Sequence, residues 1–305
     1  MSLFLGIDGG GSKTRCLAGD EACILGAGEA GGSNIVRLGA DTARRNLQEA
    51  IQRACERAGI RPDEVEHVCV GVAGASVREV NHTVREAIRA LVPGEIEVVG
   101  DMVVAMASAF ADQPGAIVIA GTGSIAFGRN EKGESARAGG WGFAISDEGS
   151  GHWIGRAAVA AVLRAHDEGR ETDLKGAMLE GWNASDTADL VRIANGQPAP
   201  DFAQLFPVVL KASDAGDWLA SNLLNSAGSE LAKLGEVVLR RLWTSGQQMR
   251  VAMGGGVFEH SPLLRRVFYH NIRAKYPRAA VCFRVVDAAE GALLLARRNA
   301  VMAGR

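Results

Sequence analysis

The sequence predicts an α/β fold built from two similar domains that face each other across a cleft. Apolar segments with the character of strands alternate with amphipathic helical segments, a pattern typical of α/β sheets. One unit, made of a strand, a glycine-rich turn and two further strands, occurs twice along the chain. The length of 305 residues agrees with two domains, because a domain averages about 150 residues. The cleft is expected where the two glycine turns converge.

The two copies of the repeated unit define the expected domains. The first copy has a turn at residues 9–14 and strands at 3–8, 15–19 and 23–32. The second copy has a turn at 121–124 and strands at 116–120, 125–129 and 135–142. We therefore predict an N-terminal domain over 1–115, completed by a terminal helix at 288–305, and a C-terminal domain over 116–287 with helical insertions.

The remaining segments are assigned from hydrophobic periodicity. Asp41 is expected to cap a helix whose apolar positions 43, 47, 50, 51 and 54 share one face, and which ends before Gly59. Further helices are expected at 80–91, 102–110, 153–166, 174–181, 187–194 and 218–243, and from 262 and 288 onwards. Further strands are expected at 65–73, 96–101, 250–253 and 281–285, and a loop with two prolines at 195–201.

The composition excludes several function classes. Lys and Arg total 33 against 35 Asp and Glu, and the net charge of −2 provides no basic field to hold nucleic acid or anionic lipid. The five cysteines are scattered without a Cys-x-x-Cys pair, which opposes a zinc knuckle or a thioredoxin-like motif. No apolar run approaches the roughly 18 residues of a membrane span. We therefore expect a cytoplasmic protein with neither nucleic acid nor membrane as its partner.

The first candidate phosphate site is the glycine turn after the first strand. A polyphosphate needs several backbone N–H groups that point at one place, and only glycine lets the main chain turn sharply and approach so closely. The segment matches neither a Walker A loop nor a dinucleotide fingerprint, because a strand follows the turn. An ordinary glycine hairpin is the alternative. The residues assigned to this site are Asp8, Gly10, Gly11, Ser12, Lys13 and Thr14.

A second glycine turn repeats the same chemistry in the second copy. One such turn is weak evidence, but two at equivalent positions of a duplicated unit favour a nucleotide that is clamped from both sides. A third glycine run follows a later strand, where adenine or ribose could lie against bare backbone, and by itself it is a weak signal. The residues of the two runs are Gly121, Thr122, Gly123 and Ser124, and Gly254, Gly255 and Gly256.

Two further motifs point to an acceptor that carries hydroxyl groups. Asp101 ends a strand, where ligands of open α/β sheets bind, and its carboxylate could accept the proton of an attacking hydroxyl. The alternative role for Asp101 is to cap the helix that follows. Glycines around Trp141 expose an aromatic face or free backbone groups, and the acidic pair at 147–148 offers acceptors, a combination that suits a sugar. The alternative there is a core tryptophan followed by an acidic helix cap.

The order and spacing of these motifs resemble the actin, hexokinase and heat-shock ATPase superfamily across nearly the whole chain. By this resemblance, residues 8–12 correspond to the first phosphate loop, 121–124 to the second, and 254–256 to the adenosine element. The resemblance implies two duplicated ribonuclease H-like, or actin-like ATPase, domains with a nucleotide and sugar cleft. It also implies that Asp8 helps to position Mg²⁺ through water.

Within this superfamily the sequence is most similar to the N-acetylglucosamine kinase branch of the BadF/BadG/BcrA/BcrD ATPase family. The more specific matches are Gly-Ser-Asn at 32–34, Gly-Asp at 100–101, Gly-Trp-Gly at 140–142 and Asp-Glu-Gly-Ser at 147–150. The resemblance implies that Ser12 and Thr122 contact the ATP phosphates and that Asp101 is the catalytic base. The family usually carries Thr where Ser12 stands, which keeps the hydroxyl. The amino sugar would be held by Ser33, Asn34, Asp101, Gly140, Trp141, Gly142 and Asp147.

The implied activity is ATP-dependent phosphorylation of an amino sugar, foremost N-acetylglucosamine at its 6-hydroxyl, with ATP and Mg²⁺ as cofactors and a homodimer as a possible assembly. N-acetylmuramic acid and glucosamine are alternative acceptors. The same family label covers ATPases that activate dehydratases or reductases through an iron–sulfur cluster held by cysteines. None of the cysteines at 16, 23, 55 and 69 lies in a glycine-rich loop suited to such a cluster. A sensor that binds the sugar without turnover is a further alternative, against which Asp8 and Asp101 argue.

Overall fold

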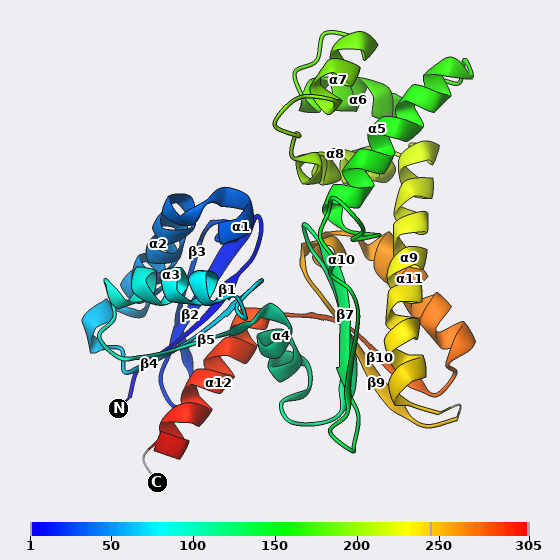
Figure 1. Cartoon of the computed structure of the whole chain (residues 1–305). Coiled ribbons are helices and arrows are strands. Elements are labelled where there is room, and N and C mark those ends of the chain that lie inside the picture. Colours follow the sequence, from blue (N-terminus) through cyan, green and yellow to red (C-terminus); the bar gives the residue numbers. More distant parts are fainter. Residues whose placement is uncertain (1, 245, 304–305) are drawn as a thin grey trace. The chain divides into compact units, whose positions relative to one another are not determined.

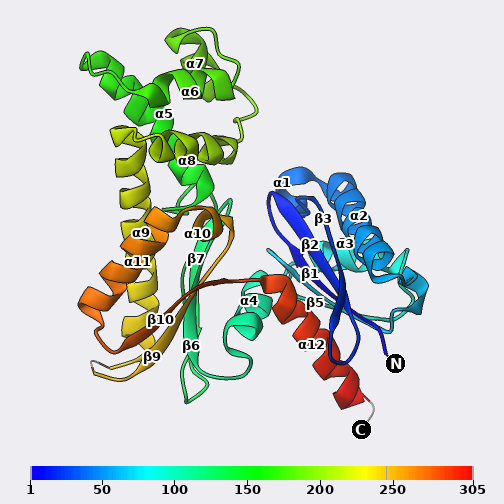
Figure 2. The same ribbon diagram turned by 180° about the vertical axis from the view of Figure 1, so that it is seen from behind.

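The computed structural model describes residues 2–244 and 246–303, and the chain divides into two compact units (Figures 1 and 2). The first unit comprises Met1–Ile117 and Val286–Arg305, and the second comprises Val118–Val285. The boundaries expected from the sequence lie at 115/116 and 287/288. Each unit carries one five-stranded sheet with helices packed against it.

The first unit contains the sheet with strand order β3-β2-β1-β4-β5. Antiparallel pairing joins β1 to β2 and β2 to β3, whereas β1, β4 and β5 are parallel neighbours. The strands are β1 (Phe4–Gly9), β2 (Lys13–Gly19), β3 (Ile24–Gly31), β4 (His67–Val72) and β5 (Glu95–Gly100). Because the carboxyl ends of β1, β4 and β5 lie at the same edge, the residues that follow these strands are brought together there.

Helices cover both faces of this sheet (Figure 1). Leu5 and Ile7 of β1 join the core formed with α2 (Ala40–Ala58) and α3 (Arg78–Arg89). Phe4 joins the other core, formed with α4 (Asp101–Phe110) and α12 (Ala288–Ala303). The alternation follows from the period of two in a strand, and it assigns Gly6 and Asp8 to the face covered by α12. The short helices are α1 (Ile35–Leu38) and η1 (Pro62–Glu64).

The second unit contains the sheet with order β10-β9-β6-β7-β8 and a helical region. Its strands are β6 (Gly115–Ala120), β7 (Ser124–Arg129), β8 (Ser135–Gly139), β9 (Met249–Gly254) and β10 (Ala279–Val286). The long helix α9 (Trp218–Leu242) packs on β7 and β8, and α11 (Pro262–Lys275) packs on α9. The other helices are α5 (Gly151–Asp167), α6 (Asp173–Gly181), α7 (Thr187–Ala194), η2 (Phe202–Leu205), α8 (Phe206–Asp214) and α10 (Gly256–His260).

One local prediction is wrong. Asp41 does not cap α2, because the helix begins at Ala40 with Gly39 as its N-cap and Asp41 lies in the first turn. Gly39 has a φ of 78°, a conformation that glycine adopts readily, and this turn joins α1 directly to α2. The sequence analysis did not predict α1, so it placed the start of α2 too late. In the described part of the chain, none of the helices is long and apolar enough to cross a membrane.

Candidate functional site

The turn between β1 and β2 is held against the loop that follows β3. The Gly10 N–H donates to Lys13 O at 3.0 Å and closes the turn, while the Ser33 N–H donates to Gly10 O at 3.0 Å. Gly32 lies so close to the turn that a Cβ there would be 2.3 Å from Gly11 O. The predicted first phosphate turn and the predicted Gly-Ser-Asn motif therefore form one structure within the first unit.

Ser33 and Asn34 differ in what they can offer to a ligand. Ser33 is 1% exposed, and its Oγ is buried without a hydrogen-bond partner. A Cβ on Gly9 would lie 2.7 Å from that Oγ, so the hydroxyl lies against the backbone at the start of the first glycine turn. Asn34 caps α1, because its Oδ1 accepts the Arg37 N–H at 3.2 Å. That contact leaves the amide nitrogen of Asn34 as a donor for a ligand.

The three side chains that end the predicted phosphate turn have different surroundings. Thr14 is fully buried, and its hydroxyl donates to Gly31 O at 2.7 Å, which joins β2 to β3. Lys13 is about half exposed, and its Nζ lies 3.7 Å from Glu29 Oε1. Ser12 and Lys13 line a pocket of about 390 Å³ on the surface of the first unit. Lys13 is thus the side chain placed to offer charge, whereas the Thr14 hydroxyl is used within the sheet.

Asp8 and Asp101 lie at the ends of two parallel strands of the first unit. Burial, together with the charges of Asp101 and Asp287, raises the pKa of Asp8 from 3.8 to about 7. Asp101 is the first residue of α4, and its Oδ1 accepts the Met102 N–H at 2.9 Å. Burial also raises the pKa of Asp101, against the lowering effect of that hydrogen bond. The predicted capping role of Asp101 is wrong, because α4 begins at Asp101 with Gly100 as its N-cap and without a side-chain capping bond.

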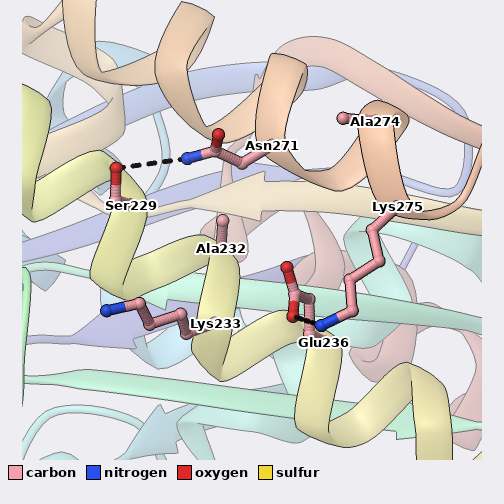
Figure 3. Close-up of a pocket in the computed structure, with 7 residues that line it drawn as sticks. All are labelled: Ser229, Ala232, Lys233, Glu236, Asn271, Ala274 and Lys275. Atoms are coloured by element: carbon pink, nitrogen blue, oxygen red, sulfur yellow. Dashed lines mark hydrogen bonds and ion pairs between the residues drawn. The ribbon is translucent and has the colours of Figure 1, made fainter.

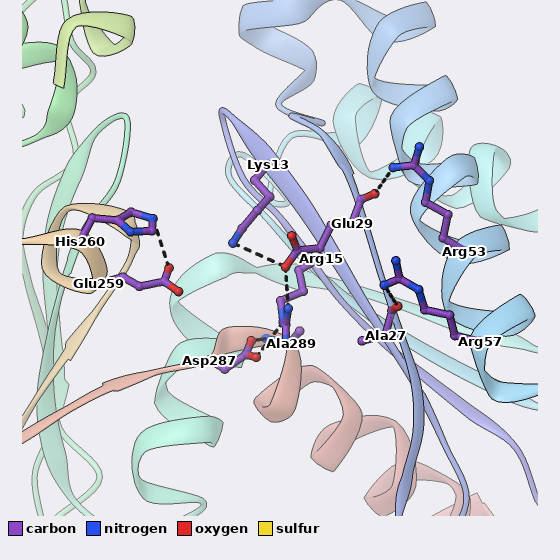
Figure 4. A network of polar contacts seen from close by, with 10 residues as sticks. All are labelled: Lys13, Arg15, Ala27, Glu29, Arg53, Arg57, Glu259, His260, Asp287 and Ala289. Atoms are coloured by element: carbon purple, nitrogen blue, oxygen red, sulfur yellow. Dashed lines mark hydrogen bonds and ion pairs between the residues drawn. The ribbon is translucent and has the colours of Figure 1, made fainter. Parts of the chain in front are cut away.

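Sequence reasoning missed Asp287, which lies between β10 and α12 (Figure 4). Its Oδ2 accepts Arg15 Nε at 2.8 Å, and Arg15 also donates to Glu29 Oε1 at 2.5 Å. Asp287 follows a strand and precedes a helix, as Asp101 does, and that signal could have identified it. The electrostatic effect on Asp8 shows that Asp287 belongs to the same acidic surroundings.

The second glycine turn lies against the N-terminus of α5 in the second unit. The Gly121 N–H donates to Gly123 O at 2.9 Å, and the Gly151 N–H donates to Gly121 O at 2.8 Å. The His152 N–H donates to Thr122 O at 3.3 Å. The Ser124 hydroxyl donates to Glu148 O at 2.9 Å. The turn is therefore fixed by the segment that carries the predicted acidic motif.

Asp147 lies directly beside this turn. It is 6% exposed, it has a φ of 71°, and its Oδ1 is buried without a hydrogen-bond partner. A Cβ on Gly123 would lie 2.7 Å from Asp147 Oδ2. Burial raises the pKa of Asp147, which the backbone N–H groups of Ser124 and Gly142 oppose. A strained backbone and an unpartnered buried oxygen mark Asp147 as a candidate ligand contact, and the neighbouring Ser146 Oγ is buried and unpartnered as well.

Trp141 is an exposed residue, so the core alternative for it is wrong. Its exposed fraction is 67%, and the Arg137 guanidinium lies 4.6 Å from the centroid of its ring. The Gly140 N–H donates to Ser124 O at 2.9 Å, which ties this loop to the second glycine turn. Gly140 and Gly142 both have positive φ, at 68° and 96°. The loop therefore offers an aromatic face beside Asp147 and the turn.

The third glycine run lies beside the second turn. Gly255 connects β9 to α10 with a φ of 91°, and a Cβ there would be 2.4 Å from Ala120 O. Ala120 precedes the Gly121 turn, and Gly254 and Gly256 flank the close contact. The structure thus gathers both predicted nucleotide elements of the second unit, together with Asp147 and Trp141, in one region.

A different surface pocket, of about 460 Å³, lies between α9 and α11 (Figure 3). Lys275 pairs with Glu236 there, and Asn271 donates to Ser229 Oγ at 3.2 Å. It contains none of the residues that the sequence predicts for the site. Within residues 2–244 and 246–303, three or more His, Cys, Asp or Glu side chains are nowhere grouped so that they could hold a metal ion.

The fold and these residues define an α/β protein with a glycine turn after the first strand of each repeated unit and with carboxylates at strand ends. Residues 5–296 match the model of the BadF/BadG/BcrA/BcrD ATPase family, and the chain belongs to that family. It is 35% identical over 97% of its length to an N-acetylmuramic acid/N-acetylglucosamine kinase of Clostridium acetobutylicum, covering 99% of that protein. It is 30% identical over 96% of its length to an N-acetyl-D-glucosamine kinase of Dictyostelium discoideum, covering 97% of that protein.

Among solved structures, the chain is similar to a protein of Chromobacterium violaceum that has been proposed to be an N-acetylglucosamine kinase. The TM-score is 0.76 at 26% identity, with 97% of this chain and 99% of that chain covered. The predicted α/β fold class and the family resemblance are confirmed.

Proposed function

We propose that this protein is an ATP-dependent amino-sugar kinase that transfers the γ-phosphoryl group to the 6-hydroxyl of N-acetylglucosamine. The observation that carries the proposal is similarity along almost the whole chain to curated kinases of N-acetylated amino sugars. The positions of Asp101, half-buried directly after β5, and of Asp147, buried beside the second glycine turn, support it. The two compact units are proposed as the two actin-like domains of the kinase.

Asp101 is proposed as the general base. Its carboxylate stands at the N-terminus of α4, at the sheet edge where ligands of such folds bind. One oxygen is held by the Met102 N–H, which fixes the carboxylate in orientation and leaves the other oxygen for the acceptor hydroxyl. The raised pKa brings Asp101 closer to the proton affinity that an efficient base needs.

The glycine turns are proposed to bind phosphate oxygens through their backbone N–H groups. Lys13, whose Nζ lies 3.7 Å from Glu29 Oε1, is proposed to add its charge, and the hydroxyls of Ser12 and Thr122 are proposed as further contacts. The Gly254–Gly256 run is proposed to lie against the adenosine. No part of this assignment requires the Thr14 hydroxyl.

Mg²⁺ is the cofactor implied by phosphoryl transfer from ATP, and it supplies charge that stabilises the transferring group. The surroundings of Asp8 fit such an ion, because the acidic neighbours that raise its pKa would be offset by a cation. Asp8 is proposed to hold the ion through water. Its role is to orient that water shell beside the phosphate turn.

The acceptor is proposed to lie against the side chains that offer unused polar groups or an open aromatic face. Asn34 offers its amide, Asp147 its unpartnered Oδ1, and Trp141 its exposed ring. Ser33, Gly140 and Gly142 shape the backbone around them. N-acetylmuramic acid is a second candidate acceptor, because the relative with 35% identity is a kinase of both sugars. A cytoplasmic location and a homodimer stay predictions.

The test is the initial rate of ADP formation with Mg-ATP, without sugar and with N-acetylglucosamine, N-acetylmuramic acid, glucosamine or glucose. The proposal expects ADP formation to depend on one of the N-acetylated sugars, and the ratio of kcat/KM values then names the preferred acceptor. Equal ADP formation in all five reactions would remove the amino-sugar proposal.

A further inference from the structure

Arg15 lies on β2 directly opposite Asp8 of β1, next to the predicted phosphate turn. Its guanidinium is occupied by two carboxylates from distant parts of the chain, as Figure 4 shows. Nε donates to Asp287 at 2.8 Å, and a terminal nitrogen donates to Glu29 at 2.5 Å. The exposed fractions of the Arg15 and Asp287 side chains are 33% and 26%. This pair is therefore partly shielded from water, and its geometry is fixed by the planar guanidinium.

Asp287 uses its other carboxylate oxygen to start α12. Oδ1 accepts the Ala289 N–H at 3.0 Å, and the Asp287 carbonyl accepts the Glu290 N–H at 3.1 Å. The chain enters the first unit at Val286, immediately before this residue. One carboxylate thus joins the start of α12 to Arg15 at the point where the chain returns to the first unit.

The helix that Asp287 starts lies on the strand that leads into the phosphate turn. A Cβ on Gly6 would be 2.1 Å from the Leu293 backbone nitrogen, so β1 and α12 are in backbone contact. Gly6 and Asp8 share that face of the sheet. A displacement of the start of α12 would therefore change the surroundings of Asp8 and of the turn beyond it.

We propose that Arg15 and Asp287 are positioning residues that hold the start of α12 against the hairpin of β1 and β2. Through this contact, nucleotide binding at the turn of the hairpin is linked to the segment at Val286, where the chain re-enters the first unit. The inference rests on the proposed nucleotide function of that turn. Two carboxylates hold the Arg15 guanidinium through Nε and one terminal nitrogen, which orients it toward them within the first unit. Lys13, whose Nζ lies 3.7 Å from Glu29 and whose side chain is about half exposed, is the phosphate ligand that the proposed function assigns to this turn.

The test uses Arg15→Met, Asp287→Asn and the double variant in the full chain. Asparagine keeps an oxygen for the Ala289 N–H, removes the charge and replaces the oxygen that accepts from Arg15 by an NH2 group. We expect each single variant to bind Mg²⁺ and the non-hydrolysable analogue AMP-PNP about 5- to 20-fold more weakly, in the range of a coupling between two sites, as measured by calorimetry. The double variant is expected to bind AMP-PNP no more weakly than the single variant with the lower affinity. At saturating ATP, kcat is expected to stay within about threefold of the unmodified protein.

Hydrogen exchange gives a measurement that would not respond to AMP-PNP in this way if Arg15 and Asp287 only stabilised the fold. AMP-PNP is expected to slow the exchange of amides 286–292 in the unmodified protein and to leave it unchanged in both single variants. Arg298→Met is the matched control, because Arg298 also lies on α12 and pairs with Asp112 at 2.5 Å away from the hairpin. It should keep both the affinity and the slowed exchange.

Two results would overturn the proposal. One is unaltered AMP-PNP affinity in Asp287→Asn, whatever Arg15→Met does, since Arg15 would then act alone. The other has two parts. The double variant loses as much AMP-PNP binding free energy as the two single variants together, and AMP-PNP still slows the exchange of amides 286–292 in the single variants. Neither result depends on a sugar, so failure here is distinct from failure of the kinase proposal, which the sugar series of the ADP assay decides.

Discussion

At the scale of single residues, Asp101 combines two roles that one substitution separates. Asp101→Asn keeps an oxygen that can accept the Met102 N–H at the start of α4, but it removes the proton acceptor. We expect kcat to fall by about 10²-fold or more, in the range of general-base catalysis, while the circular dichroism spectrum is unchanged. Near-normal phosphoryl transfer by a folded Asp101→Asn variant would show that the base lies elsewhere.

Asp8 should make the first unit less stable as the pH rises. Its pKa is about 7 in the folded protein against 3.8 as the ordinary value, mainly because burial disfavours the charged form. Between these two pH values the folded state binds more protons than the unfolded state, so the free energy of unfolding falls as pH rises. The full pKa difference corresponds to a loss of at most about 4 kcal/mol in the free energy of unfolding. The actual loss is smaller, because the Asp8 side chain is only partly buried.

The measurement compares the unmodified protein with Asp8→Asn at pH 5 and pH 7.5 in buffer without magnesium. All five tryptophans lie in the second unit, so the first unit is followed by hydrogen exchange of the β1 amides, corrected for intrinsic rates. Asp8→Asn should gain more stability relative to the unmodified protein at pH 7.5 than at pH 5, because pH 5 lies nearer the lower end of this range. The same difference at both values would contradict the assignment.

The residues that the sequence could predict are those whose partners lie nearby in the chain. Asp101, Asp147 and the glycine turns follow strands that the apolar pattern identifies, so their positions could be predicted. The place of Asp287 between a strand and a helix could be predicted, but its pairing with Arg15, 272 residues away, could not. The engagement of the Thr14 hydroxyl with Gly31 depends on the pairing of two strands, which periodicity alone does not specify.

At the scale of elements, the glycine after β9 lies in backbone contact with the residue before the second glycine turn. Gly255→Ala would place a Cβ 2.4 Å from Ala120 O and impose a φ of 91° on an alanine. We expect the second unit to lose about 2–4 kcal/mol in its free energy of unfolding, from backbone strain and overpacking together. Urea unfolding followed by tryptophan fluorescence measures this unit.

Gly176→Ala is the matched control in the same unit. Gly176 lies inside α6 with no atom within 4 Å of a Cβ placed there, so alanine should be neutral or stabilise the helix by up to about 1 kcal/mol. Equal effects of the two substitutions would show that the contact between Gly255 and Ala120 does not constrain the turn.

Most elements could be predicted because their apolar period is strong. Residues 43, 47, 50, 51 and 54 are all buried on one face of α2, as their spacing predicts. The start of that helix was misplaced because its cap is a glycine in a positive φ conformation, whose role depends on the short helix before it. The short helices α1 and α10 have too few residues to show a period.

At the scale of the whole molecule, the duplicated unit of a strand, a glycine turn and two further strands is the feature that both units share. Each copy of the motif forms the central hairpin of one five-stranded sheet, and each hairpin turn is held by a loop that carries predicted acceptor residues. In the first unit that loop carries Ser33, and in the second unit it carries Gly140. The residues predicted to bind phosphate and those predicted to bind sugar therefore lie next to each other within each unit.

The central claim is transfer of a phosphoryl group from ATP to an amino sugar, and the most direct measurement follows the phosphorus itself. Mg-ATP and N-acetylglucosamine are incubated with the protein, and the products are resolved by phosphorus NMR. The account predicts a phosphate ester on the 6-oxygen of the sugar, formed in step with ADP, with little inorganic phosphate and with at least about 10²-fold less ester from Asp101→Asn. Inorganic phosphate released at the same rate with and without the sugar, and no sugar ester, would contradict it.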